Sequence, residues 1–201
     1  MATKKDYTLV SIIGFLFAAL LIPILANLKL PFWSFTALNI IALAVGFIVF
    51  ANFALWIASL LGKIKPFFWQ FAKFGATGAL NTLLDLGVLN FLVYVTAIDA
   101  SVDDLFFRIF KAISFMVGAT NAYFWNKYWV FHSDGNATAM EYGKFFAVSL
   151  IGLFLNVAAA SVVVKIIPGA VGLQLSGLVA TAVALLWNFF GYKFMVFRRR
   201  A

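Results

Sequence analysis

The stretch FAKFGATGALNTLLDLGVLNFL, which covers Phe71–Leu92, decides the fold of this chain. It is long and apolar enough to cross a bilayer as a helix, which takes about 20 residues. It nevertheless contains Asn81, Thr82, Asp85 and Asn90. A carboxylate in hydrocarbon costs roughly 3 kcal/mol unless it faces protein or water. Since Asp85 is the only acidic residue of the apolar segments predicted below, its surroundings decide what this helix does.

The rest of the chain has the composition of an integral membrane protein. Of its 201 residues, 65% are hydrophobic and only 11% are charged, which is more apolar surface than a soluble core can bury. With no cysteine and a single histidine, His132, we expect neither disulfides nor a metal site. The net charge of +8 is better explained by orientation in the membrane and by anionic lipids than by nucleic acid.

Six apolar segments predict an all-α bundle of six transmembrane helices. Gly62–Pro66 is the clearest linker between them, and an acidic loop is expected over Asp99–Asp104. The predicted spans are Leu9–Leu28, Phe35–Leu61, Phe71–Ala97, Phe106–Phe131, Tyr142–Ile167 and Val171–Phe197. We therefore expect an N-terminal hairpin over residues 1–65 and a four-helix domain over residues 66–201.

The basic residues indicate how the six spans are oriented. If the N-terminus is inside, the outer side holds only Lys29, Arg108, Lys111 and Lys165. The inner side then holds Lys4, Lys5, Lys63, Lys65, Lys73, Lys127, Lys144, Lys193, Arg198, Arg199 and Arg200. Cytoplasmic loops carry the excess of lysine and arginine. The sequence therefore predicts a multi-pass protein of the cytoplasmic membrane with both termini in the cytoplasm.

The last four spans contain an internal repeat. Residues 126–131, NKYWVF, align with residues 192–197, YKFMVF, and residues 71–74, FAKF, align with residues 142–145, YGKF. These spans therefore predict two related hairpins that enter the membrane from the same side, as parallel repeats. Transporters commonly place their binding site between such repeats. The second repeat offers Asn156 but no acidic counterpart of Asp85.

These four spans resemble the GtrA-like family of small membrane proteins over about residues 70–200. The residues that carry the resemblance are Phe74, Gly75, Gly78, Asn81, Thr82 and Asp85, then Lys111, Ser114, Phe115 and residues 126–131, and finally Asn188, Phe189 and residues 193–197. The two N-terminal helices lie outside the family unit. The second repeat also differs from the first, with Tyr192 and Met195 in place of Asn126 and Trp129.

The resemblance implies a function in cell-surface polysaccharide synthesis or glycosylation. The expected role is the flipping of a polyprenyl-phosphate-linked monosaccharide across the cytoplasmic membrane. Its partners would be that sugar lipid and the surrounding membrane lipids. One alternative is a non-catalytic partner that recruits or stabilises a membrane glycosyltransferase, and another is a small proton-coupled exporter. A homodimer stays open, since a four- to six-helix unit is small for a transport path.

Asn81 and Asp85 are the first candidates for the substrate site. They are four residues apart and share a helix face, which we expect to turn toward the interface between the repeats. One interpretation of this face is that its hydrogen bonds only hold helices together. The other is a polar pocket for sugar hydroxyls, or a protonatable site coupled to transport. We expect no cation at the depth of Asp85. Asn188 is a candidate amide of the second repeat, with helix-to-helix hydrogen bonding as the alternative.

Basic and aromatic residues at the helix ends are the candidates for binding phosphate. Lys127 and Lys193 match in the two repeats, and a lysine supplies a point charge for a phosphate. Asn126 and Trp129 flank Lys127, although Trp129 also fits an aromatic belt and the lysines also fit membrane anchoring. Lys111 would receive the phosphate on the outer side or pair, like Arg108, with Asp103 and Asp104.

No enzymatic activity is expected from the sequence. It contains no recognisable pair of nucleophile and base, no cluster of metal ligands and no glycine-rich phosphate loop. No cofactor is expected either. The substrate-binding residues predicted from the sequence are Asn81, Asp85, Lys111, Asn126, Lys127, Trp129, Asn188 and Lys193.

Overall fold

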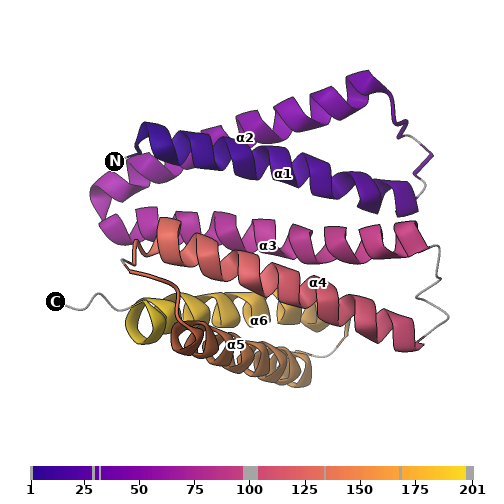
Figure 1. Ribbon diagram of the computed structural model, residues 1–201. Helices are drawn as coiled ribbons and strands as arrows, with labels where there is room; N and C mark the ends of the chain where they lie inside the picture. The colour runs from indigo at the N-terminus through magenta and orange to yellow at the C-terminus, as the bar shows by residue number, and fades with distance from the viewer. Residues whose placement is uncertain are drawn as a thin grey trace. The chain divides into compact units, whose positions relative to one another are not determined.

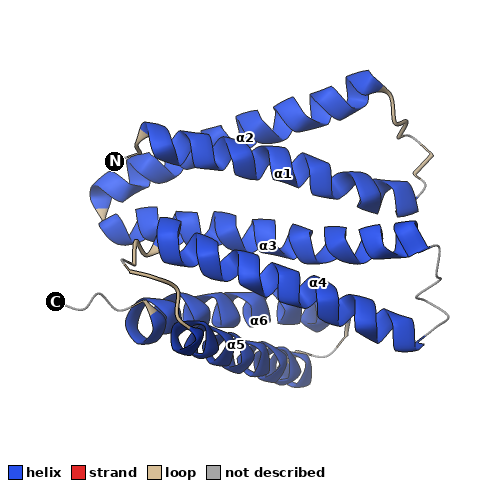
Figure 2. Cartoon of the chain, viewed as in Figure 1, coloured by secondary structure: helices blue, strands red, loops and turns tan. Residues whose placement is uncertain are grey.

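A computed structural model of the chain describes residues 2–28, 30–31, 33–96, 104–133, 135–167 and 169–197. The described residues form helices and connecting turns without any strand (Figures 1 and 2). The helices are α1 (Lys4–Leu28), α2 (Ala37–Ile64), α3 (Pro66–Thr96), α4 (Asp104–Trp125), η1 (Asn126–Val130), α5 (Ala139–Ile166), α6 (Ala170–Gly191) and η2 (Tyr192–Val196). Six of them are long and apolar enough to span a membrane, which confirms the predicted fold class.

The chain folds into two compact units. Unit 1 is Met1–Val130 and contains α1 to α4 with η1, while unit 2 is Phe131–Ala201 and contains α5, α6 and η2. Within unit 1, α3 packs against α1, α2 and α4 (Figure 1). The division at residue 65 into a hairpin and a four-helix domain stays a prediction. Most of the acidic loop predicted over Asp99–Asp104 lies outside the described residues.

Helix α1 begins at Lys4, five residues before the predicted span. The cause is a capping box. The backbone N–H of Asp6 donates to Thr3 Oγ1 over 3.2 Å, and the backbone N–H of Thr3 donates to Asp6 Oδ2 over 2.9 Å. These bonds satisfy two backbone donors that a helix start would otherwise leave unpaired. Asp6 therefore lies inside α1, although it precedes the predicted span that begins at Leu9.

The predicted linker over Gly62–Pro66 is also much shorter than expected. Helix α2 continues to Ile64 and α3 begins at Pro66, so that only Lys65 lies between them. Proline suits the first position of a helix, because the N–H that it lacks would have no partner there. Gly62 lies in α2 and faces Trp69 of α3, where an added Cβ would come within 2.8 Å of the tryptophan Cβ.

Both predicted repeats end in the same unusual way. The residues after α4 and those after α6 each form five-residue π-helices, η1 and η2, at aligned positions of the sequence. Each π-helix also contains one ring of a stacked pair. The ring centres of Phe124 and Tyr128 lie 6.2 Å apart, and those of Phe190 and Phe194 lie 6.1 Å apart. π-Helical turns are rare and often mark functional sites. Their occurrence at aligned positions supports the internal repeat.

A glycine controls the packing of α1 on α2. A Cβ added to Gly14 would lie 2.7 Å from the carbonyl oxygen of Phe47 and 2.8 Å from the Cα of Ile48. Both atoms belong to the backbone and cannot move aside as a flexible side chain can. The two helices therefore require glycine at this point. Gly46, which directly precedes Phe47 in α2, has nothing within 4 Å of its added Cβ.

Gly14→Ala is expected to lower the free energy of unfolding by roughly 1–3 kcal/mol, since an extra methyl group would push the backbones apart. Gly46→Ala is the matched control, and it should be neutral or stabilise the helix by up to about 1 kcal/mol, given that alanine is the better helix former. Thermal unfolding of both variants in detergent measures the difference. Equal melting temperatures would contradict the close approach at Gly14.

Candidate functional site

One stripe of α3 carries four of the polar side chains of this helix. Lys73, Thr77, Asn81 and Asp85 follow one another at intervals of four residues and therefore lie along one slowly winding face. The stripe extends about 18 Å at 1.5 Å per residue, which is more than half of a hydrocarbon layer about 30 Å thick. Thr77 is fully buried and donates its hydroxyl to the Lys73 carbonyl over 3.0 Å.

Asp85 forms an ion pair with Lys111 of α4. The Lys111 ammonium donates to Asp85 Oδ2, and Ser114 Oγ donates to Asp85 Oδ1 over 2.6 Å. Lys111 and Ser114 are three residues apart and so share a helix face. Both carboxylate oxygens of Asp85 accept a hydrogen bond. The adjacent ammonium compensates the negative charge, which would be costly on its own in a membrane. The side chains of Lys111 and Asp85 stay 43% and 23% exposed, so the pair is accessible at the protein surface.

One prediction about this pair was wrong. The sequence predicts no cation at the depth of Asp85, whereas Lys111 lies beside it. The predicted pairing of Lys111 with Asp103 and Asp104 falls on side chains outside the described residues, and its contact with a phosphate stays a prediction. Asp85 makes these contacts with α4, the other helix of its own hairpin.

Asn81 lies one turn before Asp85 on the same stripe. Its side chain packs on Gly118 of α4, whose added Cβ would lie 3.3 Å from Asn81 Oδ1. This oxygen is buried and has no hydrogen-bond partner among the described residues. A buried acceptor without a donor costs roughly 1–3 kcal/mol. Such a group at the candidate site is suited to accept a hydrogen bond from a hydroxyl of a ligand.

A second ion pair lies at the other end of the stripe. Lys73 Nζ lies 2.9 Å from Asp6 Oδ1, and the Trp129 indole N–H donates to the same oxygen over 2.9 Å. The ammonium also donates to the Trp129 carbonyl over 3.3 Å and lies 5.0 Å from the ring of Trp69. Asp6, Lys73 and Trp129 are all buried, between 2% and 6% exposed. Trp129 is thus a buried hydrogen-bond donor and not a member of an aromatic belt.

The other candidates of the first repeat lie in η1. Lys127 is completely buried, 5.7 Å from the ring centre of Tyr128, and so does not snorkel toward a membrane surface. Asn126 is buried too and donates to the Ala122 carbonyl over 2.8 Å, while its Oδ1 has no partner among the described residues. The π-helix therefore turns an amide and an ammonium inward within one short segment.

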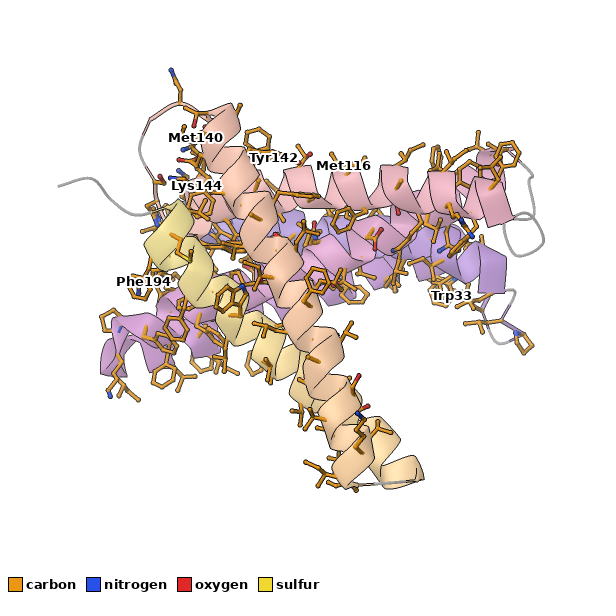
Figure 3. The ribbon with its side chains drawn as sticks, turned by 90° about the horizontal axis from the view of Figure 1, so that it is seen from below. Trp33, Met116, Met140, Tyr142, Lys144 and Phe194 are labelled. Atoms are coloured by element: carbon orange, nitrogen blue, oxygen red, sulfur yellow. The ribbon has the colours of Figure 1, made fainter. Side chains whose placement is uncertain are left out.

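Asn188 and Lys193 belong to unit 2 and are described within it. Asn188 packs directly on Gly152 of α5, and its buried Oδ1 has no partner in the described part of the chain. Lys193 is half-buried, 5.6 Å from the ring of Phe189 and 5.8 Å from that of Phe194. Lys144, the counterpart of Lys73, is exposed on the first turns of α5 (Figure 3).

Sequence reasoning missed Asp6 and did not connect Ser114 with Asp85. A signal for Asp6 exists, because Thr3 and Asp6 have the spacing of a capping box and would move the helix start forward. Ser114 is four residues from Gly118 on α4, in the row that faces the α3 stripe. Among the described residues, no group of histidine, cysteine or acidic side chains has the arrangement of a metal site.

A comparison with protein families assigns residues 73–197 to the GtrA/DPMS transmembrane domain. The chain belongs to this family. The match covers more than half of the chain, begins at Lys73 and ends after η2, so that α1 and α2 lie outside it. No curated protein and no solved structure matches the chain. The GtrA/DPMS domain fits a family of multi-pass membrane proteins that act in the translocation of lipid-linked sugars and are generally regarded as non-enzymatic.

The Asp85–Lys111 pair should show strong coupling in a double-mutant cycle. Asp85→Asn and Lys111→Met each leave one charge without its partner and are expected to lower the free energy of unfolding by roughly 1–3 kcal/mol. The double variant should recover about 0.5–3 kcal/mol of the summed loss. Denaturation in mixed micelles measures all four proteins.

Lys165→Met, on an exposed position of α5, is the control for removal of a lysine from a membrane helix. It should change the free energy of unfolding by less than either member of the pair. Strictly additive losses for Asp85→Asn and Lys111→Met would show that the two charges do not stabilise each other.

Proposed function

We propose that this protein moves a polyprenyl-phosphate-linked monosaccharide across the cytoplasmic membrane, for cell-surface polysaccharide synthesis or glycosylation. The observation that carries the proposal is the polar stripe of α3 with the ion-paired Asp85 and the unpaired oxygen of Asn81. A sugar is rich in hydroxyl donors and acceptors, and such a stripe offers it partners at depths where lipid offers none. Family membership supports the same class of substrate.

Each predicted substrate residue keeps a role in this proposal. Asn81, Asp85 and Lys111 would contact the sugar along the α3 stripe. Asn126, Lys127 and Trp129 of η1 would hold the phosphate and the groups next to it. Within unit 2, Asn188 and Lys193 stay predicted substrate-binding residues. Buried lysines suit this task, because an anion that enters replaces a partner and does not have to compete with water.

The alternatives differ in how the structure bears on them. A proton-coupled exporter was suggested by an acid alone in the membrane, and the Lys111 ammonium beside Asp85 removes that support. A non-catalytic partner of a glycosyltransferase would need Asp85 only to hold helices together. The partial exposure of Asp85 and Lys111 favours contact with a ligand over this purely structural role.

Flipping of a fluorescent polyprenyl-phosphate sugar in liposomes tests the proposal. The wild-type protein should move the lipid between leaflets. Asp85→Ala/Lys127→Ala and Asn81→Leu should each slow the movement about tenfold or more, which corresponds to about 1.4 kcal/mol at the barrier. Lys63→Gln, at an exposed position of α2, should keep the wild-type rate.

Two outcomes of the flipping assay count against the proposal in different ways. Equal rates for the wild type and Asp85→Ala/Lys127→Ala would refute these residues as the site. No flipping by a folded wild-type protein would favour the role of a partner that recruits or stabilises a glycosyltransferase.

We also propose that both termini lie in the cytoplasm, as the excess of basic residues on that side indicates. The chain has no cysteine, so single cysteines can report sidedness. Ser34→Cys, in the α1–α2 connection, should react with a membrane-impermeant maleimide on intact cells. Asn136→Cys, in the α4–α5 connection, should react only after the membrane is permeabilised, and the reverse pattern would invert the topology.

A further inference from the structure

Asp6 lies in a ring of hydrogen-bond donors that has the composition of an anion site. Its Oδ1 receives the Lys73 ammonium and the Trp129 indole N–H, each over 2.9 Å. Its Oδ2 receives the Thr3 backbone N–H over 2.9 Å and the Thr3 hydroxyl over 2.7 Å. One ammonium, one indole N–H, one hydroxyl and one amide therefore surround a single negative group. A phosphate oxygen accepts the same kinds of charge-assisted hydrogen bonds as a carboxylate oxygen.

The donors come from two different parts of the protein. Thr3 and Asp6 belong to the start of α1, outside the residues that match the family, while Lys73 and Trp129 lie inside the match. The two donors from inside the match converge on one oxygen of Asp6. If the start of α1 moved away, Lys73 and Trp129 would keep facing the same point. They would form a buried cationic site without its anion, which is costly in a low dielectric.

The start of α1 can leave this site without unpacking the whole helix. The first apolar residues that hold α1 in the core are Val10 and Ile13, each 3% exposed. Before them, Asp6 is the only buried residue that the structure describes, while Thr3, Lys4 and Lys5 are exposed. The carboxylate thus holds the first turn in place largely through Lys73 and Trp129. Replacement of the carboxylate by another anion would release this turn and leave the rest of α1 packed.

We propose that Lys73 and Trp129 form a binding site for a lipid phosphate, and that Asp6 occupies this site as a displaceable internal ligand. The proposal rests on the function proposed above for the nature of the lipid, because a polyprenyl phosphate supplies an anion at headgroup depth. The second repeat differs at this position, since its aligned lysine, Lys144, is exposed whereas Lys73 is buried.

Binding of farnesyl phosphate, a short prenyl phosphate, to the full-length protein in detergent tests this site. Asp6→Asn keeps the size and an acceptor oxygen but removes the competing charge, so it should bind farnesyl phosphate about tenfold more tightly than the wild type. Lys73→Gln should bind it about tenfold more weakly. Farnesol, which lacks the phosphate, should bind all variants alike. An unchanged or weaker affinity of Asp6→Asn for farnesyl phosphate would overturn the proposal.

Glu141→Gln is the matched control for Asp6→Asn. It removes the acidic residue from the first turn of α5, where Thr138 caps the helix as Thr3 caps α1, and it changes the net charge by the same amount. Its affinity for farnesyl phosphate should equal that of the wild type. A gain as large as that of Asp6→Asn would mean that net charge, and not the site at Lys73, governs binding.

A second measurement leaves Asp6 and Lys73 in place and does not depend on the folding of either variant. Lys4→Cys carries an environment-sensitive fluorophore on the exposed first turn of α1. Farnesyl phosphate should shift its emission, and farnesol should not. No shift at saturating farnesyl phosphate would show that Asp6 is a fixed structural contact. Failure of flipping in liposomes together with this shift would refute the proposed function and leave the phosphate site standing.

Discussion

An ionised side chain in a membrane helix must meet its opposite charge, and this constraint organises unit 1. Neither an acid nor an amine is stable alone at low dielectric, so each charge of the α3 stripe has a partner on another helix. Asp6 connects α1 with Lys73, and Lys111 connects α4 with Asp85. Apolar packing alone would leave the helices free to slide and rotate, because lipid and core are equally apolar. The two ion pairs fix α1 and α4 beside α3 and set their register.

The helices themselves follow from the sequence because hydropathy, end charge and length act on each segment separately. Six spans could therefore be predicted, whereas their ends could not. Thr3 and Asp6 extend α1 toward the N-terminus through a capping box, and Pro66 starts α3 directly after Lys65. In both places a local backbone preference overrides the polar composition that suggested a loop or a linker. Ends depend on capping chemistry, which involves only a few atoms and is weakly visible in composition.

The polar residues of the α3 stripe could be identified from the sequence, but the partners of its charges could not. Asp85 and Asn81 stand out because polar groups are rare in a membrane helix. The partner of Asp85 lies 26 residues away on another helix, and no rule of spacing within one helix connects them. Lys111 was placed at the outer surface by its position near a helix start, yet its long side chain reaches the acid on α3. The burial of Lys127 was missed for a related reason, since a lysine next to aromatic residues also fits a membrane surface.

The two hairpins are related in sequence, but they carry their polar residues at different aligned positions. Counted from the aligned Lys73 and Lys144, Asn81 of α3 corresponds to Gly152 of α5, and the amide of the second hairpin comes instead from Asn188 of α6. Each hairpin thus packs one asparagine against one glycine, with the two roles exchanged. The charged groups are not exchanged in this way: Asp85 aligns with the neutral Asn156, and Lys111 aligns with Gly177 when counted from Lys127 and Lys193. Packing therefore explains what the repeats have in common, and the ion pair of the first hairpin requires a separate reason, which binding of a polar, phosphorylated lipid would supply.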